Sequence, residues 1–481
     1  MNVSKNIFSP ISKHTAATAL LVLAFYFFSA VPSICAGAEG AGETSGPGHQ
    51  GAIKNAPALF SSRFFYEPNP PASFTSATPE GQVTVQTTLR PELQRRLMSC
   101  FAHAAPLIAA AVVLDANTGA VLAMGNQTTK AGVRLLPDGA NNYCLYGEFP
   151  AASLAKMITA SVALEKKGFN SSHLVPVSGR YHTLYRSQVG IENAPYKPEL
   201  VPMLKAFALS INPYFGKMWL DSFTDRDFLD MGKDMLFNMP LEFELPVTKS
   251  RMVPPTDDFQ RAELASGYNT RTTLSPLHAA LIASLPANGG KIMRPYIIDS
   301  ITDANGKTVY QHMTKTLSQP LSPRSASQLG ELMQGTIQNG TARGSFTYAK
   351  QIGAANGWTM GGKTGSIDLP EHTGRCDWFA GFGQTNQTSI AVACILVHGA
   401  QRTMHSSFVG AEMIRACLDP TSVNKQPAIQ AKTTKPMPSK KESPPTPAVA
   451  PRPPQKNKNP SLQATKPESK KQKSPQQKTG G

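Results

Sequence analysis

The sequence predicts an α+β fold, in which a five-stranded antiparallel sheet is covered by helices. Three observations support this prediction. Two apolar, strand-like runs lie between residues 108 and 124, a long segment of mixed pattern with many helices continues to about residue 355, and three more strand-like runs precede a closing helix. Strands and helices therefore do not alternate one by one, as they would in a doubly wound sheet.

A helix and a β-hairpin are predicted at the start of the domain. The helical pattern runs from Pro91 to Ala104. Ile108–Asp115 and Ala120–Met124 are apolar runs separated by the turn sequence Asn117-Thr118-Gly119, which is typical of two antiparallel neighbours.

The three strand-like runs near the end of the domain are Trp358–Asp368, Asp377–Gln384 and Ser389–His398. A last helix is predicted from Ser407 to Leu418 and ends before Pro420.

The six cysteines, at positions 35, 100, 144, 376, 394 and 417, include no Cys-x-x-Cys pair and have no metal-ligand spacing with the ten histidines. Some of them could pair outside the cytoplasm, in a connectivity that spacing does not fix. Cys394 lies in an apolar run and is predicted to be a buried free thiol. No metal or cofactor is predicted.

The N-terminus has the pattern of a targeting segment. Lys5 and Lys13 precede an uncharged apolar run from Ala16 to about Ile34, which is short for a bilayer span and long for a signal peptide core. Residues 1–36 are therefore expected to anchor the chain in the cell membrane. The alternative is a signal peptide cleaved at Ala36-Gly37-Ala38. Either places the rest of the chain on the periplasmic or extracytoplasmic side.

Composition divides the rest of the chain into three parts. Residues 37–81, rich in Gly, Ala, Ser and Pro, are predicted to be a flexible spacer, and residues 82–419 form the globular domain. Residues 420–481, rich in Pro, Lys, Gln and Ser, are predicted to be disordered because they cannot bury a core.

The basic charge is concentrated in this tail. From residue 424 onward thirteen basic residues stand against two acids, so +11 of the net charge of +16 lies there. Nucleic-acid binding by the domain is therefore not predicted. The tail is either a solvated linker or a cationic arm that contacts anionic wall polymer or lipid head groups.

A helix predicted from Ala152 to Lys167, closed by Gly168, carries the first candidate site. Ser153 and Lys156 are three residues apart in its first turn and project from one face, so a neutral lysine amine could take the serine proton. The free N–H groups of the helix start favour a developing oxyanion. A lone Ser-x-x-Lys is also common by chance, where the serine is only a helix cap.

Two more polar clusters complete the candidate site. Ser210-Ile211-Asn212 follows an apolar stretch, so Ser210 could relay a proton and Asn212 could bind a substrate amide; alone, the cluster indicates only the end of a helix. Lys363-Thr364-Gly365-Ser366 lies in a strand after two glycines, which suits a substrate running along a sheet edge. Thr364 and Ser366 are expected to share the inward side and bind a carboxylate, while Lys363 points the other way or skirts the site.

Together the three motifs, in this order and spacing, resemble the transpeptidase domain of penicillin-binding proteins. The resemblance covers nearly all of residues 82–419. It includes the segments Val83–Leu89, Ala111–Asp115 with Thr118-Gly119, Leu274–His278, Ala287–Lys291, Asn339–Ala342 and Asp377–Gly381.

The resemblance implies an all-helical subdomain beside the sheet and a role for each matching position. Ser153 would be the acylated nucleophile, Lys156 its base and Ser210 the proton relay. Backbone N–H groups of Ser153 and Ser366 would form the oxyanion hole. Asn212 would bind the substrate amide, Lys363 would support the hydroxyl network, and Thr364 and Ser366 would bind the terminal carboxylate of a D-Ala-D-Ala stem peptide or of a β-lactam.

The sequence departs from the family pattern at three points. Ser366 replaces the more common threonine but keeps the hydroxyl. Ser266-Gly267-Tyr268-Asn269 differs from the usual Gly-Gln pair. The spacer of about forty-five residues leaves no room for a glycosyltransferase or pedestal domain, so a monofunctional type without a pedestal is expected.

The predicted function is a penicillin-binding D,D-transpeptidase that cross-links peptidoglycan stem peptides through a serine acyl-enzyme, with cell-wall synthesis proteins as possible partners. A D,D-carboxypeptidase is the alternative, because acylation is identical and only the acceptor differs. A β-lactamase is disfavoured because no Glu-x-x-Leu-Asn follows the Ser-x-Asn motif. A penicillin sensor is disfavoured because only about fifteen residues precede the apolar run.

Overall fold

The computed structural model describes residues 59–60, 64, 70–135, 142–193, 197–370, 373–419 and 421, all within a compact unit that spans Met1–Ala428. The predicted membrane anchor, most of the predicted spacer and the basic tail lie outside the described residues. Within the ranges just given, no helix has the length and apolar character needed to cross a membrane.

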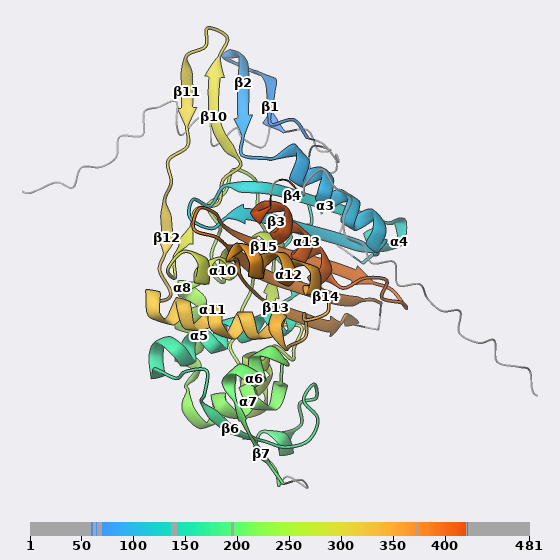
Figure 1. The fold of residues 1–481 in the computed structure, drawn as a ribbon, viewed down its shortest axis with the longest axis vertical. Helices are drawn as coiled ribbons and strands as arrows, with labels where there is room; N and C mark the ends of the chain where they lie inside the picture. The colour runs from blue at the N-terminus through green and yellow to red at the C-terminus, as the bar shows by residue number, and fades with distance from the viewer. Residues whose placement is uncertain are drawn as a thin grey trace, which may run out of the picture. The chain divides into compact units, whose positions relative to one another are not determined.

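A five-stranded antiparallel sheet forms the centre of the domain, as predicted, in the order β13-β14-β15-β3-β4 (Figure 1). The strands are β3 (Ile108–Asp115), β4 (Val121–Thr128), β13 (Thr359–Asp368), β14 (Arg375–Gln384) and β15 (Ser389–His398). The pairing of β15 with β3 joins the early hairpin to the late strands. The α+β prediction is confirmed.

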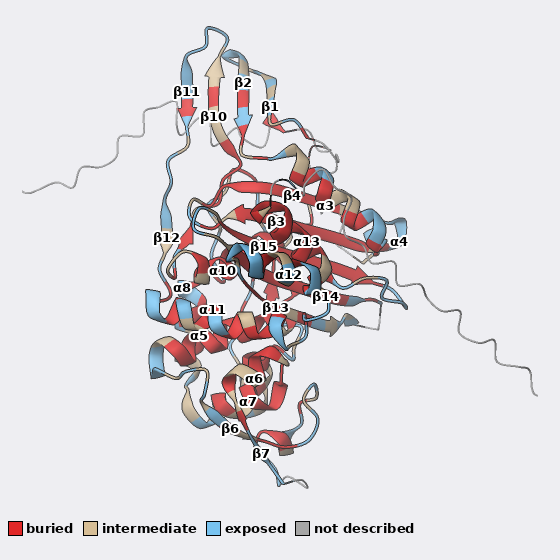
Figure 2. Ribbon diagram, viewed as in Figure 1, coloured by how far each residue is buried: buried red, intermediate tan, exposed pale blue. Residues whose placement is uncertain are grey.

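Alternation along the strands divides the apolar side chains between two cores. Ala110, Val112 and Leu114 belong to one core, whereas Ala109 and Val113 belong to the other. These strands are buried on both faces, as Figure 2 shows in red. Helices therefore cover both sides of the sheet.

One face is covered by α3 (Pro91–Ala104), α12 (Thr347–Asn356) and α13 (Ser406–Leu418), whose apolar side chains enter the second core. The other is contacted by α10 (Pro276–Ala283), α11 (Pro323–Gln338) and the 3-10 turn η2 (Ala152–Leu154), which continues into α5 (Ala155–Lys167). The predicted helices over 91–104, 152–167 and 407–418 are thus present, the second beginning as a tighter 3-10 turn.

The predicted helical subdomain contains a small sheet as well as helices. Its helices include α6 (Met203–Ala208), α7 (Asn212–Ser222), α8 (Asp225–Asp234) and α9 (Asp258–Ser266). The strands β6 (Leu174–Val177) and β7 (Glu199–Pro202) pair antiparallel, so the subdomain is not all-helical. Each strand contains valine and proline, which favour extended backbone over helix.

A separate four-stranded sheet has the order β1-β2-β10-β11: β1 (Ser73–Thr78), β2 (Gly81–Thr87), β10 (Ile298–Asp303) and β11 (Thr308–Gln311). The prediction that residues 37–81 are entirely spacer is therefore wrong at its C-terminal end, where β1 pairs with β2. The Phe74 ring packs against Phe60 and Phe64, with ring centroids 5.7 and 5.4 Å away. This aromatic cluster gives the short strand an apolar surface to bury.

Short elements complete the described chain. They are α4 (Lys130–Val133), η3 (Arg186–Gln188), η4 (Leu285–Ala287), and the paired strands β5 (Phe149–Pro150) with β8 (Thr273–Leu274) and β9 (Ile292–Met293) with β12 (Thr316–Ser318). The described cysteines, at positions 100, 144, 376, 394 and 417, are buried and free, which confirms the prediction for Cys394.

Candidate active site

Ser153 lies in a tight turn at the start of a buried helix. The preceding residue, Ala152, has the left-handed φ of 49°, and the 3-10 turn η2 places Ser153 one residue later. Gly267 lies directly against this turn, where a Cβ would overlap the carbonyl oxygen of Ala152. The sharp turn leaves the Ser153 side chain half-buried, while its neighbours Ala152 and Leu154 are in the core.

Lys156 is buried beneath Ser153 and its amine has three polar neighbours. Nζ lies 2.8 Å from Ser153 Oγ, 2.7 Å from Asn212 Oδ1 and 2.6 Å from the carbonyl oxygen of Ser266. Burial of the side chain, with a smaller contribution from the positive charge of Lys363, lowers the pKa of Lys156 well below its ordinary value. Burial therefore makes the uncharged amine more accessible than it is for a lysine in water.

Lys363 lies in the cluster, not on its edge as predicted. Its Nζ donates to Ser210 Oγ at 2.9 Å and to the carbonyl oxygen of Thr364 at 2.9 Å, and the side chain is buried. The alternation of side chains along a strand predicts on which face of β13 Lys363 lies. It does not predict that the turn at Ser210 packs against that face, so the prediction for Lys363 was wrong. Burial lowers the pKa of Lys363 to about 7.

The second motif is a strained turn between α6 and α7. Ser210 has a left-handed φ of 58°, and Asn212 begins α7. Ile211 N donates to the carbonyl oxygen of Ala206 at 2.9 Å, which fixes the turn. The two side chains reach different lysines, Ser210 to Lys363 and Asn212 to Lys156.

β13 is an edge strand of the central sheet, and η2 contacts it. At Gly365 a Cβ would come within 3.4 Å of Ser153 N, so the absence of a side chain lets the strand approach the serine turn. Thr364 is half-buried and Ser366 exposed, whereas Lys363 and Gly365 are buried. The two hydroxyl residues thus keep access to solvent, which a carboxylate-binding role requires.

Five of the seven predicted residues form two hydrogen-bonded groups, which meet at the turn that carries Ser210 and Asn212. Ser153, Lys156 and Asn212 are linked through the Lys156 amine; Ser210 and Lys363 are linked directly. Thr364 touches the cluster through its carbonyl oxygen. No hydrogen bond of Ser366 to this cluster is present among the described residues.

Three neighbours of the cluster were not predicted. Ser266 supplies a carbonyl oxygen to Lys156, which no side-chain motif could reveal. The hydroxyl of Thr341 lies 2.5 Å from that of Thr364, and the segment Asn339–Ala342 that contains it was already a point of family resemblance. The carbonyl oxygen of Tyr181 accepts a hydrogen bond from Asn212 N at 2.8 Å; only the folded chain brings these two residues together.

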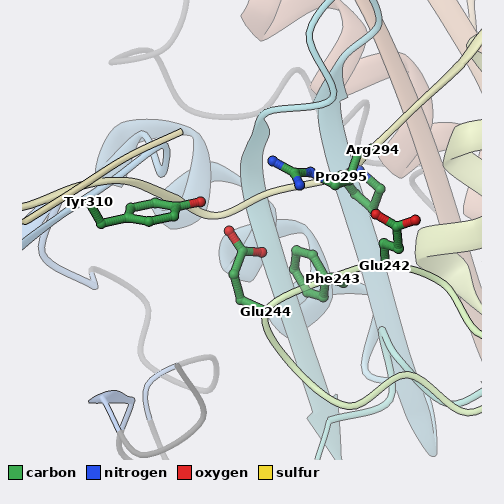
Figure 3. A pocket seen from close by; sticks show the side chains of 6 residues that line it. All are labelled: Glu242, Phe243, Glu244, Arg294, Pro295 and Tyr310. Atoms are coloured by element: carbon green, nitrogen blue, oxygen red, sulfur yellow. The ribbon is translucent and has the colours of Figure 1, made fainter. Parts of the chain in front are cut away.

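A separate hollow of about 200 Å³ lies beside the four-stranded sheet and is lined by Glu242, Phe243, Glu244, Arg294, Pro295 and Tyr310 (Figure 3). Glu244 is buried, and its Oε1 accepts hydrogen bonds from the backbone N–H groups of Ile297 and Ile298 at 3.1 and 3.2 Å. This carboxyl group therefore fastens the segment after α8 to the start of β10.

Comparison with known proteins shows the family. The model of the penicillin-binding protein transpeptidase domain matches residues 109–419. The chain therefore belongs to the penicillin-binding protein transpeptidase family, as the three motifs predicted.

Characterised relatives share about a quarter of their residues with this chain. The peptidoglycan D,D-transpeptidase PbpA of Mycobacterium tuberculosis is 27% identical over 365 residues, covering 68% of this chain and 70% of the relative. The penicillin-binding protein PbpB of Mycolicibacterium smegmatis is 24% identical over 296 residues, covering 59% and 44%.

Solved structures share the fold. The crystal structure of PBPA from M. tuberculosis has a TM-score of 0.56 and 24% identity, covering 69% of this chain and 80% of that one. The apo form of penicillin-binding protein 3 from the same organism has a TM-score of 0.58 and 19% identity, covering 70% and 80%.

Proposed function

We propose that this protein is a serine D,D-transpeptidase that cross-links peptidoglycan stem peptides through an acyl-enzyme on Ser153. The observation that carries this proposal is the position of the Lys156 amine, in hydrogen-bond contact with Ser153 Oγ. Its other two partners, Asn212 Oδ1 and Ser266 O, are acceptors only. They take the two hydrogens of a neutral amine, whose lone pair is then left for the serine hydroxyl.

In the acylation step Lys156 accepts the proton of Ser153, and Oγ attacks the carbonyl carbon between the two terminal D-alanines. The C–O bond forms as the peptide C–N bond breaks. Ser210 gives its hydroxyl proton to the leaving nitrogen and takes up the proton that Lys156 removed from Ser153, so both groups return to their starting state. Lys363 donates a hydrogen bond to Ser210 Oγ and holds that hydroxyl in place. The exposed hydroxyls of Thr364 and Ser366 hold the terminal carboxylate, and the backbone N–H groups of Ser153 and Ser366 receive the oxyanion.

In the second step an amine from a neighbouring stem peptide replaces the enzyme on the acyl carbon and completes a cross-link. Water in place of the amine would give a carboxypeptidase. The names of the relatives, peptidoglycan D,D-transpeptidases in M. tuberculosis and M. smegmatis, favour the amine. β-Lactams would enter the same site and remain on Ser153 as covalent inhibitors.

We place the catalytic domain, residues 82–419, outside the cytoplasm. The charge and apolar pattern of residues 1–36 supports a membrane anchor. Stem peptides are assembled into the wall on that side, so the location fits the substrate.

Labelling with a fluorescent penicillin tests the acyl-enzyme directly. We expect one covalent label per chain, located on the peptide that contains Ser153, and no label on Ser153→Ala. Ser73→Ala, which removes an exposed hydroxyl on β1, is the matched control and should label normally. Equal labelling of Ser153→Ala and the control would refute the assignment.

A further inference from the structure

The loop that follows α11, residues 339–342, lies against the end of α6. Thr341 N donates to the carbonyl oxygen of Ala208 at 3.1 Å, two residues before Ser210. A Cβ at Gly340 would overlap the same carbonyl oxygen, so the absence of a side chain there allows the two segments to approach. The backbone of the loop is therefore fixed beside the Ser-x-Asn turn.

From this position the Thr341 side chain reaches β13. Its Oγ1 lies 2.5 Å from Oγ1 of Thr364. Among the residues that the structure describes, this is the one hydrogen bond of the Thr364 hydroxyl. Thr341 is exposed and Thr364 is half-buried, so this pair of hydroxyls remains open to a ligand that enters from solvent.

The direction of the hydrogen bond between the two threonines depends on the ligand. A hydroxyl can donate its hydrogen and accept another on its oxygen at the same time, whereas a carboxylate only accepts. When Thr364 donates to a carboxylate, its hydrogen is no longer available to Thr341. The hydrogen bond between them must then run from Thr341 to Thr364.

This direction favours binding of an anion in two ways. A hydroxyl that accepts a hydrogen bond is polarised and becomes a better donor, and hydrogen bonds to charged acceptors are stronger than those to neutral ones. The contact also selects the rotamer of Thr364, because Cβ carries a methyl group as well as the hydroxyl. A rotamer with these two groups exchanged would present a methyl group where the carboxylate needs a donor.

We propose that Thr341 is a positioning residue for the donor peptide: it donates to Thr364 and directs the Thr364 hydroxyl to the terminal carboxylate. The inference rests on the transpeptidase function proposed above, which assigns that carboxylate to Thr364 and Ser366. Within the described residues, neither threonine hydroxyl bonds to Ser153 or Lys156. Thr341 should therefore affect which donor is accepted and leave the chemistry of the serine unchanged.

The test measures how strongly the enzyme prefers a donor with a free carboxylate. Two acyl donors are compared, an N-acyl-D-alanyl thioglycolate and the same thioester with its carboxylate converted to a carboxamide, and the ratio of their kcat/KM values is determined. We expect Thr341→Val, which keeps the shape but lacks the hydroxyl, to lower this ratio by about three- to tenfold, through slower reaction of the carboxylate donor alone. Thr341→Ser keeps the hydroxyl and should stay near wild type. Thr308→Val, at an exposed threonine on β11, is the matched control.

A double-mutant cycle shows whether Thr341 acts through Thr364. Thr364→Val should lower the ratio by itself. Adding Thr341→Val to that variant should lower it no further, because the hydroxyl that Thr341 directs is already gone.

Each other outcome counts against the proposal or against the function on which it rests. Equal ratios for Thr341→Val and Thr308→Val would overturn the role of Thr341 and leave acylation of Ser153 intact. So would a Thr341→Val variant that slows both donors equally, because the hydroxyl would then stabilise only the loop. A further loss on the Thr364→Val background would overturn positioning through Thr364, since Thr341 would then bind the carboxylate itself. A wild type that uses both donors equally would overturn the inference together with the carboxylate assignment, whereas a wild type that uses neither donor and does not react with penicillin would overturn the proposed function.

Discussion

At the scale of single residues, the site depends on two lysines that the fold keeps away from water. Lys156 and Lys363 are both fully buried, and no acidic side chain is among their hydrogen-bond partners. Their pKa values are lowered mainly because burial disfavours the charged form. Burying two amines destabilises the folded protein. It also disfavours their charged forms, and an uncharged amine can accept the proton of a serine hydroxyl.

Replacing Lys156 tests the base directly. We expect Lys156→Ala, and equally Lys156→Arg, to slow penicillin acylation by about 10³-fold, because neither leaves a neutral amine beside Ser153. Lys166→Ala, an exposed lysine on the same helix, is the control. In the wild type the acylation rate should fall as the pH drops through the lowered pKa of Lys156, where the amine becomes charged. A wild-type acylation rate that does not fall on acidification, or fast acylation by Lys156→Ala, would contradict the assignment.

At the scale of elements, two glycines lie against the turn that carries Ser153, the proposed nucleophile. Gly365 lets β13 approach the serine turn, and Gly267 lets the end of α9 lie against Ala152. Ser266, the last residue of α9, supplies the carbonyl oxygen that holds Lys156. The departure from the usual family sequence at 266–269 therefore falls on residues that build the site.

Gly267→Ala should damage the site more than an equivalent change elsewhere. Gly267 and Gly168 both end helices with left-handed φ values, 69° and 62°, but only at Gly267 would a Cβ overlap another backbone atom. We expect Gly168→Ala to lower the free energy of unfolding by roughly 1–2 kcal/mol without slowing acylation. Gly267→Ala should lose about 1–3 kcal/mol more and acylate slowly, as measured by denaturant unfolding and penicillin labelling. Equal effects of the two changes would show that the overlap is relieved without cost.

Replacing Glu244 tests how the segment after α8 is attached to the start of β10 in the four-stranded sheet. Glu244→Ala leaves two buried backbone N–H groups without acceptors, so we expect a loss of about 2–3 kcal/mol in the free energy of unfolding. Glu244→Gln keeps an acceptor oxygen and should stay near wild type. Burial raises the pKa of Glu244, so the folded state favours the protonated form. The wild type should therefore lose stability relative to Glu244→Gln as the pH rises above the ordinary carboxyl pKa, and the loss should level off once the raised pKa is passed. Thermal unfolding from pH 4.5 to 8 measures this difference; an alanine variant as stable as the glutamine variant would contradict the attachment.

At the scale of the whole domain, the central sheet separates the site from an ion network. Ser153 lies on the face covered by α10 and α11. On the other face Glu412 of α13 accepts from Arg96 of α3 at 2.6 Å and from Arg415 at 2.9 Å, all three side chains being buried. This network joins α3 and α13, two of the three helices that cover that face.

Breaking the network should weaken the fold without changing the chemistry. Glu412→Ala leaves two guanidinium groups buried without their shared carboxylate, so we expect a loss of about 3–5 kcal/mol in the free energy of unfolding. Below its melting temperature the variant should still acylate at close to the wild-type rate, because the sheet lies between Glu412 and Ser153. Slow acylation by a variant shown to be folded would instead reveal coupling across the sheet.

Much of the fold could be predicted from the sequence because its signals are local. β3, β15 and α3 begin and end where the apolar patterns and Pro91 indicated. β6 and β7 were missed because each has only four residues and pairs with a strand on the far side of a long connection. β1 was missed because its six residues are mostly small or polar, so composition did not distinguish it from the spacer.

By itself, the sequence determined the fold class, the family and the side chains with the right chemistry at Ser153, Lys156, Ser210 and Asn212, since motif spacing and residue type are properties of the chain. Only the tertiary structure decided that Lys363 turns inward to Ser210, that a main-chain oxygen of Ser266 holds the Lys156 amine, and that the carbonyl oxygen of Tyr181 accepts a hydrogen bond from Asn212 N. These contacts join segments far apart in the chain. The burial of the lysine amines and their distances to neighbouring groups, which set their pKa values, are therefore fixed only once the chain has folded.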